Sequence, residues 1–127
     1  MGPVPIFTFK KTQRLLNAAD YKRVFDSNRV KISNSTLLIL AKPVNGHPSR
    51  LGLVIAKKNI PTAVQRNRIK RIARETFRKN QFRIPLDIVF LARQGADKLP
   101  AHMLTSILEA SWAKLDQRCK LLEDQHA

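Results

Sequence analysis

The chain has few acidic side chains, a single cysteine and no long apolar run. Asp and Glu account for 9 of its 127 residues, against 24 Lys and Arg, so the formal net charge is +15. Cys119 has no second cysteine with which to form an internal disulfide or a thiolate metal cluster. No apolar stretch approaches the roughly 20 residues of a membrane-spanning helix. The sequence therefore predicts a soluble, cytoplasmic protein.

The acidic residues that are present form no catalytic or metal-binding pattern. Protein nucleases use clustered carboxylates that hold metal ions, or a pair of histidines. Here the 9 acids are scattered and lie mostly in positions typical of solvent-exposed residues, and the 3 histidines share no ligand spacing. Glu75 is expected to pair with Arg71 or Arg78 at helical spacing. We therefore expect no catalytic side chain, no metal ligand and no bound cofactor in this chain.

The excess of positive charge favours a polyanionic partner. Nucleic acid is the first candidate and an anionic membrane surface the second. The length and the apolar content of 43% predict one globular domain. We place this domain at residues 15–122, between an extended basic segment at 1–14, where Pro3 and Pro5 oppose a helix, and a short tail at 123–127.

The first half of the domain is predicted to hold one helix and a strand pair. The helix spans about 17–27, with Asn17 as N-cap, Asp20 in the place of a capping-box acid, and Leu16 and Tyr21 as a hydrophobic staple. Apolar runs at 37–41 and 51–56 flank a turn with Asn45-Gly46, which predicts a hairpin. An additional short strand at 30–33 is a further option.

The second half is predicted to hold a basic helix at 63–80, a buried strand at 87–92 and a last helix at 101–122. The last helix carries an apolar stripe with Trp112 and Cys119 at its edge; the stripe consists of Leu104, Ile107, Leu108, Ser111, Leu115 and Leu122. The element order is then α-β-β-α-β-α, which is typical of a small α+β domain with helices packed on one sheet.

The basic helix is the most informative segment of the chain. Eight Lys or Arg and one acid lie between Arg66 and Arg83. Helical periodicity places apolar residues on one face and cations on the opposite face. The apolar face holds Ile69, Ile72, Ala73, Thr76 and Phe77, and the opposite face holds Asn67, Lys70, Arg71, Arg74 and Arg78.

A solvated charged surface is the bland interpretation of such a face. An exposed helix normally alternates charge signs, and this helix lacks the interleaved acids, so we favour binding of phosphate groups. Asn67 has two interpretations, because its amide can contact a phosphate or base edge, or can cap the helix N-terminus. The hypothesis requires the cations to point outward and to lie beside the groove at the first helix.

Two segments of the chain form a specific pattern. They are Arg50-Leu51-Gly52-Leu53-Val54-Ile55-Ala56-Lys57-Lys58-Asn59 and Ala63-Val64-Gln65-Arg66-Asn67-Arg68-Ile69-Lys70-Arg71, the latter followed by Arg74-Glu75. With these segments the chain resembles a known family, the protein component of bacterial ribonuclease P. The resemblance covers roughly 15–122, whereas the turn at 43–49 and both termini match poorly.

The resemblance implies an accessory subunit of an endoribonuclease that removes the 5′ leader from precursor tRNA. It implies that a large RNA subunit carries the active site and its Mg²⁺, and that no protein oligomer is required. The implied fold is ribosomal-protein-like, with a mostly antiparallel sheet and a left-handed β-α-β crossover. The residues implied to bind the RNA subunit are Arg66, Asn67, Arg68, Lys70, Arg71 and Arg74, with Lys57 and Lys58 extending the track.

The resemblance also implies that the leader binds in a cleft between the first helix and the sheet. Tyr21 and Phe25 are four residues apart, so their rings share a helix face and can stack on unpaired bases of any identity. The alternative is that both rings belong to the core. Arg14 and Arg23 are expected to flank the cleft. Many relatives have a further aromatic in the next strand, where residues 37–40 here, Ile39 and Leu40 included, are all aliphatic.

Three rival functions remain at this point. A ribosome-associated RNA-binding protein would have the same fold class and charge. A helix-turn-helix DNA reader suits the sequence less well, because no paired short helix precedes Arg66. A membrane-surface helix is weaker still, since the apolar face of the basic helix is narrow and contains no Trp or Leu.

Overall fold

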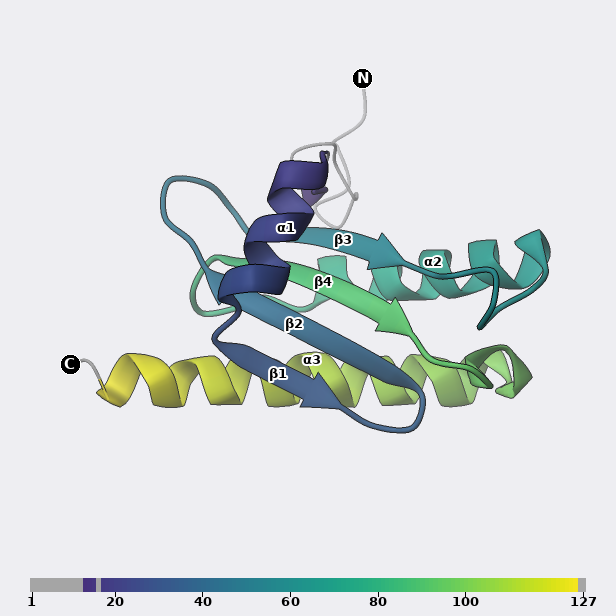
Figure 1. Ribbon diagram of the computed structural model, residues 1–127. Coiled ribbons are helices and arrows are strands. Elements are labelled where there is room, and N and C mark those ends of the chain that lie inside the picture. The colour runs from purple at the N-terminus through teal and green to yellow at the C-terminus, as the bar shows by residue number, and fades with distance from the viewer. Residues whose placement is uncertain (1–12, 16, 126–127) are drawn as a thin grey trace, which may run out of the picture.

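A four-stranded sheet forms the centre of the molecule (Figure 1). The structure is a computed structural model that describes residues 13–15 and 17–125, without the side chains of 123–125. Its elements are α1 (Ala18–Ser27), β1 (Val30–Ser33), β2 (Leu37–Pro43), β3 (Arg50–Val54), α2 (Ala63–Lys79), β4 (Leu86–Ala92), the short 3-10 helix η2 (Ala96–Lys98) and α3 (Ala101–Gln125). This confirms the predicted α+β class and the optional strand at 30–33.

The strand order is β1-β2-β4-β3, so the predicted hairpin between 37–41 and 51–56 is wrong. β4 lies between those two strands, antiparallel to β2 and parallel to β3. All residues of β4 except Leu91 are buried, and such a continuous apolar strand fits the centre of a sheet covered on both faces. The hairpin that forms joins β1 to β2, and Asn34 builds its turn by accepting hydrogen bonds from the N–H groups of Thr36 and Leu37.

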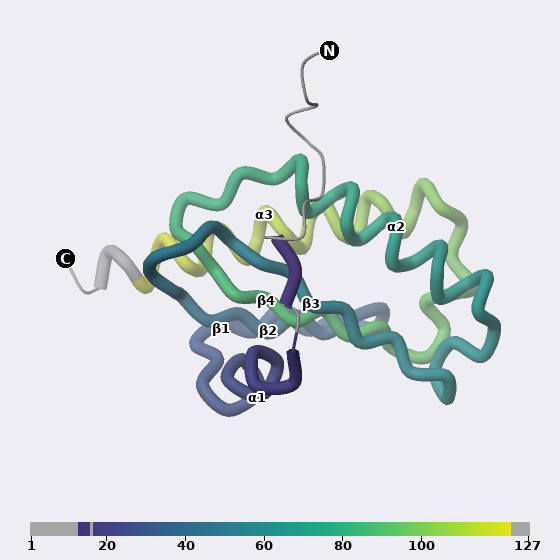
Figure 2. Tube along the Cα trace, turned by 90° about the horizontal axis from the view of Figure 1, so that it is seen from above, coloured from purple at the N-terminus to yellow at the C-terminus, as the bar shows by residue number. Residues whose placement is uncertain are grey.

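The connection from β3 through α2 to β4 is a left-handed crossover. In Figure 1 both strands point to the right and β4 lies below β3, while Figure 2 shows α2 on the far side of the sheet from α1. Moving from β3 to β4 through a helix behind the sheet describes a left-handed turn. This confirms the handedness that the family resemblance implied, against the general preference for right-handed crossovers.

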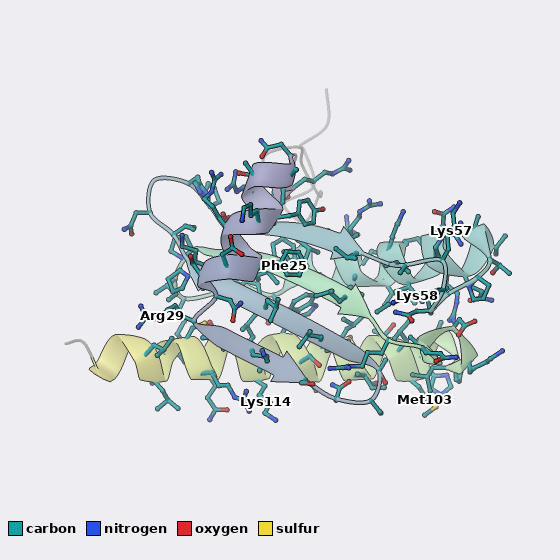
Figure 3. All side chains as sticks on the ribbon, in the orientation of Figure 1. Phe25, Arg29, Lys57, Lys58, Met103 and Lys114 are labelled. Atoms are coloured by element: carbon teal, nitrogen blue, oxygen red, sulfur yellow. The ribbon has the colours of Figure 1, made fainter. Side chains whose placement is uncertain are left out.

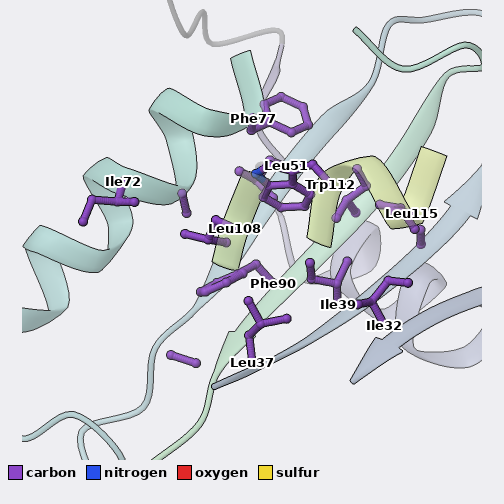
Figure 4. Close-up of a cluster of buried hydrophobic side chains, with 14 of the residues drawn as sticks. Ile32, Leu37, Ile39, Leu51, Ile72, Phe77, Phe90, Leu108, Trp112 and Leu115 are labelled. Carbon is purple, nitrogen blue, oxygen red and sulfur yellow. The ribbon is translucent and has the colours of Figure 1, made fainter. Parts of the chain in front are cut away.

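Trp112 lies at the centre of the main core, between the sheet and the helix pair α2 and α3 (Figure 4). Its side chain is 0% exposed, its Nε1–H donates to Thr76 Oγ1 at 2.8 Å, and its ring meets Phe77 and Phe82 edge-on. Cys119 is also buried, so both residues belong to the buried stripe of α3 itself. The prediction that they lie at the edge of this stripe is wrong. The hydrogen bond to Thr76 offsets the cost of removing the indole N–H group from water.

α1 covers part of the opposite sheet face through a smaller apolar cluster of Leu15, Val24, Leu40 and Val89. The helix begins as predicted, because Asn17 Oδ1 accepts a hydrogen bond from Asp20 N–H at 2.9 Å. The proposed staple involves Leu16, which lies outside the described residues, as does the predicted extended segment apart from Gln13 and Arg14.

Candidate nucleic-acid interface

α2 has the two faces that its periodicity predicts. Its five predicted apolar positions are all buried: Ile69, Ile72, Ala73, Thr76 and Phe77. The helix N-cap is Thr62, whose Oγ1 accepts from Gln65 N–H at 3.3 Å. Asn67 is therefore not the cap, and its exposed side chain lies in the second turn among the cations. The capping interpretation of Asn67 is wrong.

The guanidinium groups of Arg66 and Arg68 bind backbone carbonyls. Arg66 Nη1 donates to the carbonyl oxygens of Ile60 at 3.0 Å and Pro61 at 2.8 Å. Arg68 Nη2 donates to those of Asp97 at 3.2 Å and Leu99 at 2.9 Å. The two arginines thus hold the connection before α2 and the η2 loop against the helix.

The basic face of α2 consists of the remaining predicted residues: Lys57, Lys58, Asn67, Lys70, Arg71 and Arg74. Within the described part of the chain, no carboxylate lies in ion-pair range of Lys57, Lys58, Lys70 or Arg71. Glu75 forms no ion pair with Arg71 or Arg78, so that prediction is wrong. Figure 3 shows Lys57 and Lys58 beside the first turns of α2, at the end of β3.

Arg74 is a half-buried member of the basic face. Partial burial lowers the pKa of its guanidinium, the positive charge of Arg14 lowers it further, and Tyr21 acts in the opposite direction. α1 and α2 lie on opposite faces of the sheet (Figure 2). The cations of α2 therefore do not lie beside the groove at the first helix, and that part of the sequence-based hypothesis is wrong.

The two predicted aromatic residues of α1 have different surroundings. The Tyr21 hydroxyl accepts a hydrogen bond from Leu53 N–H at 3.2 Å, and a Cβ atom at Gly52 would lie 2.6 Å from Tyr21 Cε1. Glycine is thus needed for this close approach, and Tyr21 is a half-buried anchor of α1. Phe25 is 43% exposed and lies on the flank of α1 over the sheet, so it is not a core residue (Figure 3).

Beside α1 the sheet presents a half-buried row of aliphatic side chains. Leu38, Leu91 and Val54 are neighbours in the strand register, and Ser33 of β1 continues the row. We call Phe25 and these three aliphatic residues the platform. Ile39 and Leu40 do not contribute to it, because both are buried in the two cores.

A charge network that sequence reasoning missed fixes α1 to the sheet. Asp20 and Asp87 are only 4% and 3% exposed. Arg50 donates to both carboxylate oxygens of Asp87, at 2.9 and 2.7 Å, and its Nη2 lies 3.7 Å from Asp20, which also pairs with Arg23. The hydrogen bond with Asp87 raises the pKa of Arg50. Arg50 and Asp87 face each other only because β3 pairs with β4.

Other kinds of site were also sought among the described residues. They contain no group of three or more His, Cys, Asp or Glu that could hold a metal ion, and no helix long and apolar enough to cross a membrane. Burial raises the pKa of the Cys119 thiol to about 11.

Comparisons with known proteins agree with this architecture. The family model described as Ribonuclease P matches residues 9–116. The ribonuclease P protein component of Saccharophagus degradans is 44% identical over 117 residues, which cover 91% of this chain and 87% of that protein. The corresponding protein of Marinobacter nauticus is 43% identical over 111 residues, covering 87% and 84%.

Solved structures give the same result. The RNase P protein of Staphylococcus aureus superimposes with a TM-score of 0.73 at 29% identity, covering 81% of this chain and 96% of that one. The RNase P protein of Thermotoga maritima gives a TM-score of 0.64 at 25% identity, covering 76% and 96%. The chain therefore belongs to the family of ribonuclease P protein components.

Proposed function

We propose that this protein binds two RNA partners on two surfaces as a subunit of ribonuclease P. The basic face of α2 binds the catalytic RNA subunit, and the platform beside α1 binds the 5′ leader of precursor tRNA. Membership of the family supports a role in tRNA processing. The observation that carries the proposal is that four cations of the basic face have no carboxylate within ion-pair range among the described residues: Lys57, Lys58, Lys70 and Arg71.

The basic face contributes through charge. RNA affinity comes mostly from neutralised phosphates and released counterions. Arg71 and Arg74 offer planar, paired donors, whereas Lys70 offers a compact charge. Under this proposal the RNA subunit and its Mg²⁺ carry out the phosphodiester hydrolysis. The protein lowers repulsion between crowded phosphates and positions the RNA.

The platform contributes through the leader, which mature tRNA lacks. The exposed ring of Phe25 can stack on an unpaired base, and base–aromatic stacking is worth about 1–3 kcal/mol per base. Leu38, Leu91 and Val54 provide an apolar surface for neighbouring bases without reading their hydrogen-bonding edges. Binding of this kind tolerates many leader sequences and favours substrate over product.

Reconstitution tests the proposed function. The purified protein is added to a bacterial ribonuclease P RNA, and precursor tRNA cleavage is measured as Mg²⁺ is lowered. We expect the protein to reduce the Mg²⁺ concentration needed for cleavage, because its cations replace part of the ionic screening. A ribosome-associated RNA-binding protein would leave the Mg²⁺ requirement unchanged, and that result would contradict the proposal.

A further inference from the structure

The platform has a direction, because α1 lies across the strands and covers only part of the sheet face (Figure 1). The exposed row beside it therefore runs from β3 to β1, through Val54, Leu91, Leu38 and Ser33. Its β3 end is Val54, the last residue of β3, and the chain leads from there directly to Lys57 and Lys58 of the basic face (Figure 3). Its β1 end opens at the outer edge of the sheet, where β1 is paired on one side only.

A groove of about 250 Å³ continues from the β1 end of the row. It lies between β1 and α3, and we call it the exit groove; its lining residues are Ile32, Ser33, Asn34, Ile107, Ala110, Ser111 and Lys114. Hydroxyl, amide and ammonium groups thus follow directly after the apolar row. Such groups suit the sugar and phosphate groups of a nucleic acid more than its bases.

The exit groove is surrounded by cations. Lys31, Arg93, Lys114 and Arg118 are all exposed, and none has a carboxylate in ion-pair range among the described residues. Arg93 Nη2 donates to Ser33 Oγ at 2.8 Å, which places a guanidinium at the end of the row. Arg118 Nη1 donates to the carbonyl oxygen of Lys31, which fastens α3 against the edge strand.

A lysine on an edge strand has a simpler explanation, since it prevents pairing with another sheet. This explanation covers Lys31 alone. Lys114 and Arg118 belong to α3, and Arg93 follows β4, yet all of them meet at the same edge. Cations that come from β1, from α3 and from the segment after β4 thus surround one groove, which indicates an anionic ligand.

We propose that the leader crosses the sheet from β3 to β1 and that its 5′-distal nucleotides bind the exit groove. This inference rests on the proposed function. The basic face, which we assign to the catalytic RNA, lies at the β3 edge, so the nucleotides next to the cleavage site lie at that end. The 5′ end of the leader then leaves over β1, where Lys31 and Lys114 contact its phosphates.

The width of the sheet sets the leader length at which the exit groove begins to matter. Three interstrand spacings of about 4.8 Å make the row about 14 Å long. At a stacked rise of about 3.4 Å per nucleotide this corresponds to about four nucleotides. Shorter leaders end on the platform, and longer leaders reach the exit groove.

Graded leaders test the proposal in the reconstituted holoenzyme. Affinity is measured for precursor tRNAs whose leaders are shorter or longer than this length, with K31E, K114E and the control K120E. Lys120 is also on α3 but lines a different hollow with Arg83 and Asp116. We expect K31E and K114E each to weaken binding of long leaders by about fivefold and to leave short leaders unchanged. Equal effects on both leader lengths, or equal effects of K120E, would overturn the proposal.

Crosslinking identifies the occupant of the groove. K114C and K120C are labelled with a photoreactive group, and the native Cys119 does not interfere because it is buried. We expect K114C to crosslink to the 5′-distal leader, and K120C to give background only. Crosslinks of K114C to the RNA subunit, or none above the control, would refute the leader path. If the proposed function itself failed, even the short leader would give no gain in affinity over mature tRNA.

Discussion

Phe25 and Tyr21 lie one helical turn apart on α1, but Tyr21 anchors the helix to the sheet and Phe25 is exposed to solvent. Tyr21 is held by its hydrogen bond from Leu53 N–H and by its close approach to Gly52, whereas Phe25 exposes its ring. Their spacing in the sequence predicts that the rings share a helix face. It does not predict which ring is free, because that depends on the distance between α1 and β3.

This difference gives a prediction for single substitutions. We expect Phe25→Ala to weaken precursor tRNA binding to the holoenzyme by about tenfold or more, because one stacked base is lost. Mature tRNA binding should not change, and stability should change by no more than about 0.5 kcal/mol, because the side chain is exposed. Tyr21→Phe is the matched variant: it should lower the free energy of unfolding by about 1 kcal/mol through its lost hydrogen bond and should spare the preference for precursor. An equal loss for precursor and mature tRNA in Phe25→Ala would count against the platform.

Sequence reasoning at the residue scale succeeded where contacts are local and failed where they are not. The cap at Asn17 was predicted because its partner is three residues away. The network of Arg50, Asp87 and Asp20 was missed because its members come from three elements. Arg66 and Arg68 stood out as cations in the sequence, but nothing local shows that they bind the carbonyls of neighbouring loops.

At the scale of elements, α2 separates two kinds of arginine. Arg68 is bonded to the η2 loop and its flank, whereas Arg71 is exposed on the basic face. We expect Arg68→Ala to lower the free energy of unfolding by about 1–3 kcal/mol, since charged hydrogen bonds to two carbonyl groups are lost. Arg71→Ala should leave the stability unchanged within about 0.5 kcal/mol and should weaken binding to the RNA subunit. Urea denaturation and binding titrations check the two effects, and equal stability losses would contradict the distinction.

The helices were predicted closely, and the pairing of the strands was not. Periodicity identifies the buried face of α2 because neighbours on a helix are near in sequence. The hairpin between 37–41 and 51–56 was predicted because these two apolar runs flank the turn at Asn45-Gly46. It was wrong because β4, more than thirty residues later, is apolar enough to be buried on both faces and takes the position between them. Pairing over such separations leaves no local signal in the sequence.

At the scale of the whole molecule, the sheet separates the two proposed RNA surfaces. α2 and α3 cover one face, and α1 covers part of the other (Figure 2). The net charge of +15 indicated a polyanionic partner without indicating where it binds. Because the crossover is left-handed, α2 and its basic face lie on the side of the sheet opposite α1 (Figure 2).

The salt dependence of holoenzyme assembly tests most directly whether the basic face binds the RNA subunit. Dissociation constants for the RNA subunit are measured over a range of salt concentrations for the wild type, for Lys70→Gln with Arg71→Gln, and for Lys120→Gln. If both side chains contact phosphates, the double variant binds more weakly, and its slope of log K against log salt is shallower by about 2, or about 1 per lost contact. Lys120→Gln should keep the wild-type slope. A double variant with the slope of the wild type would contradict the account.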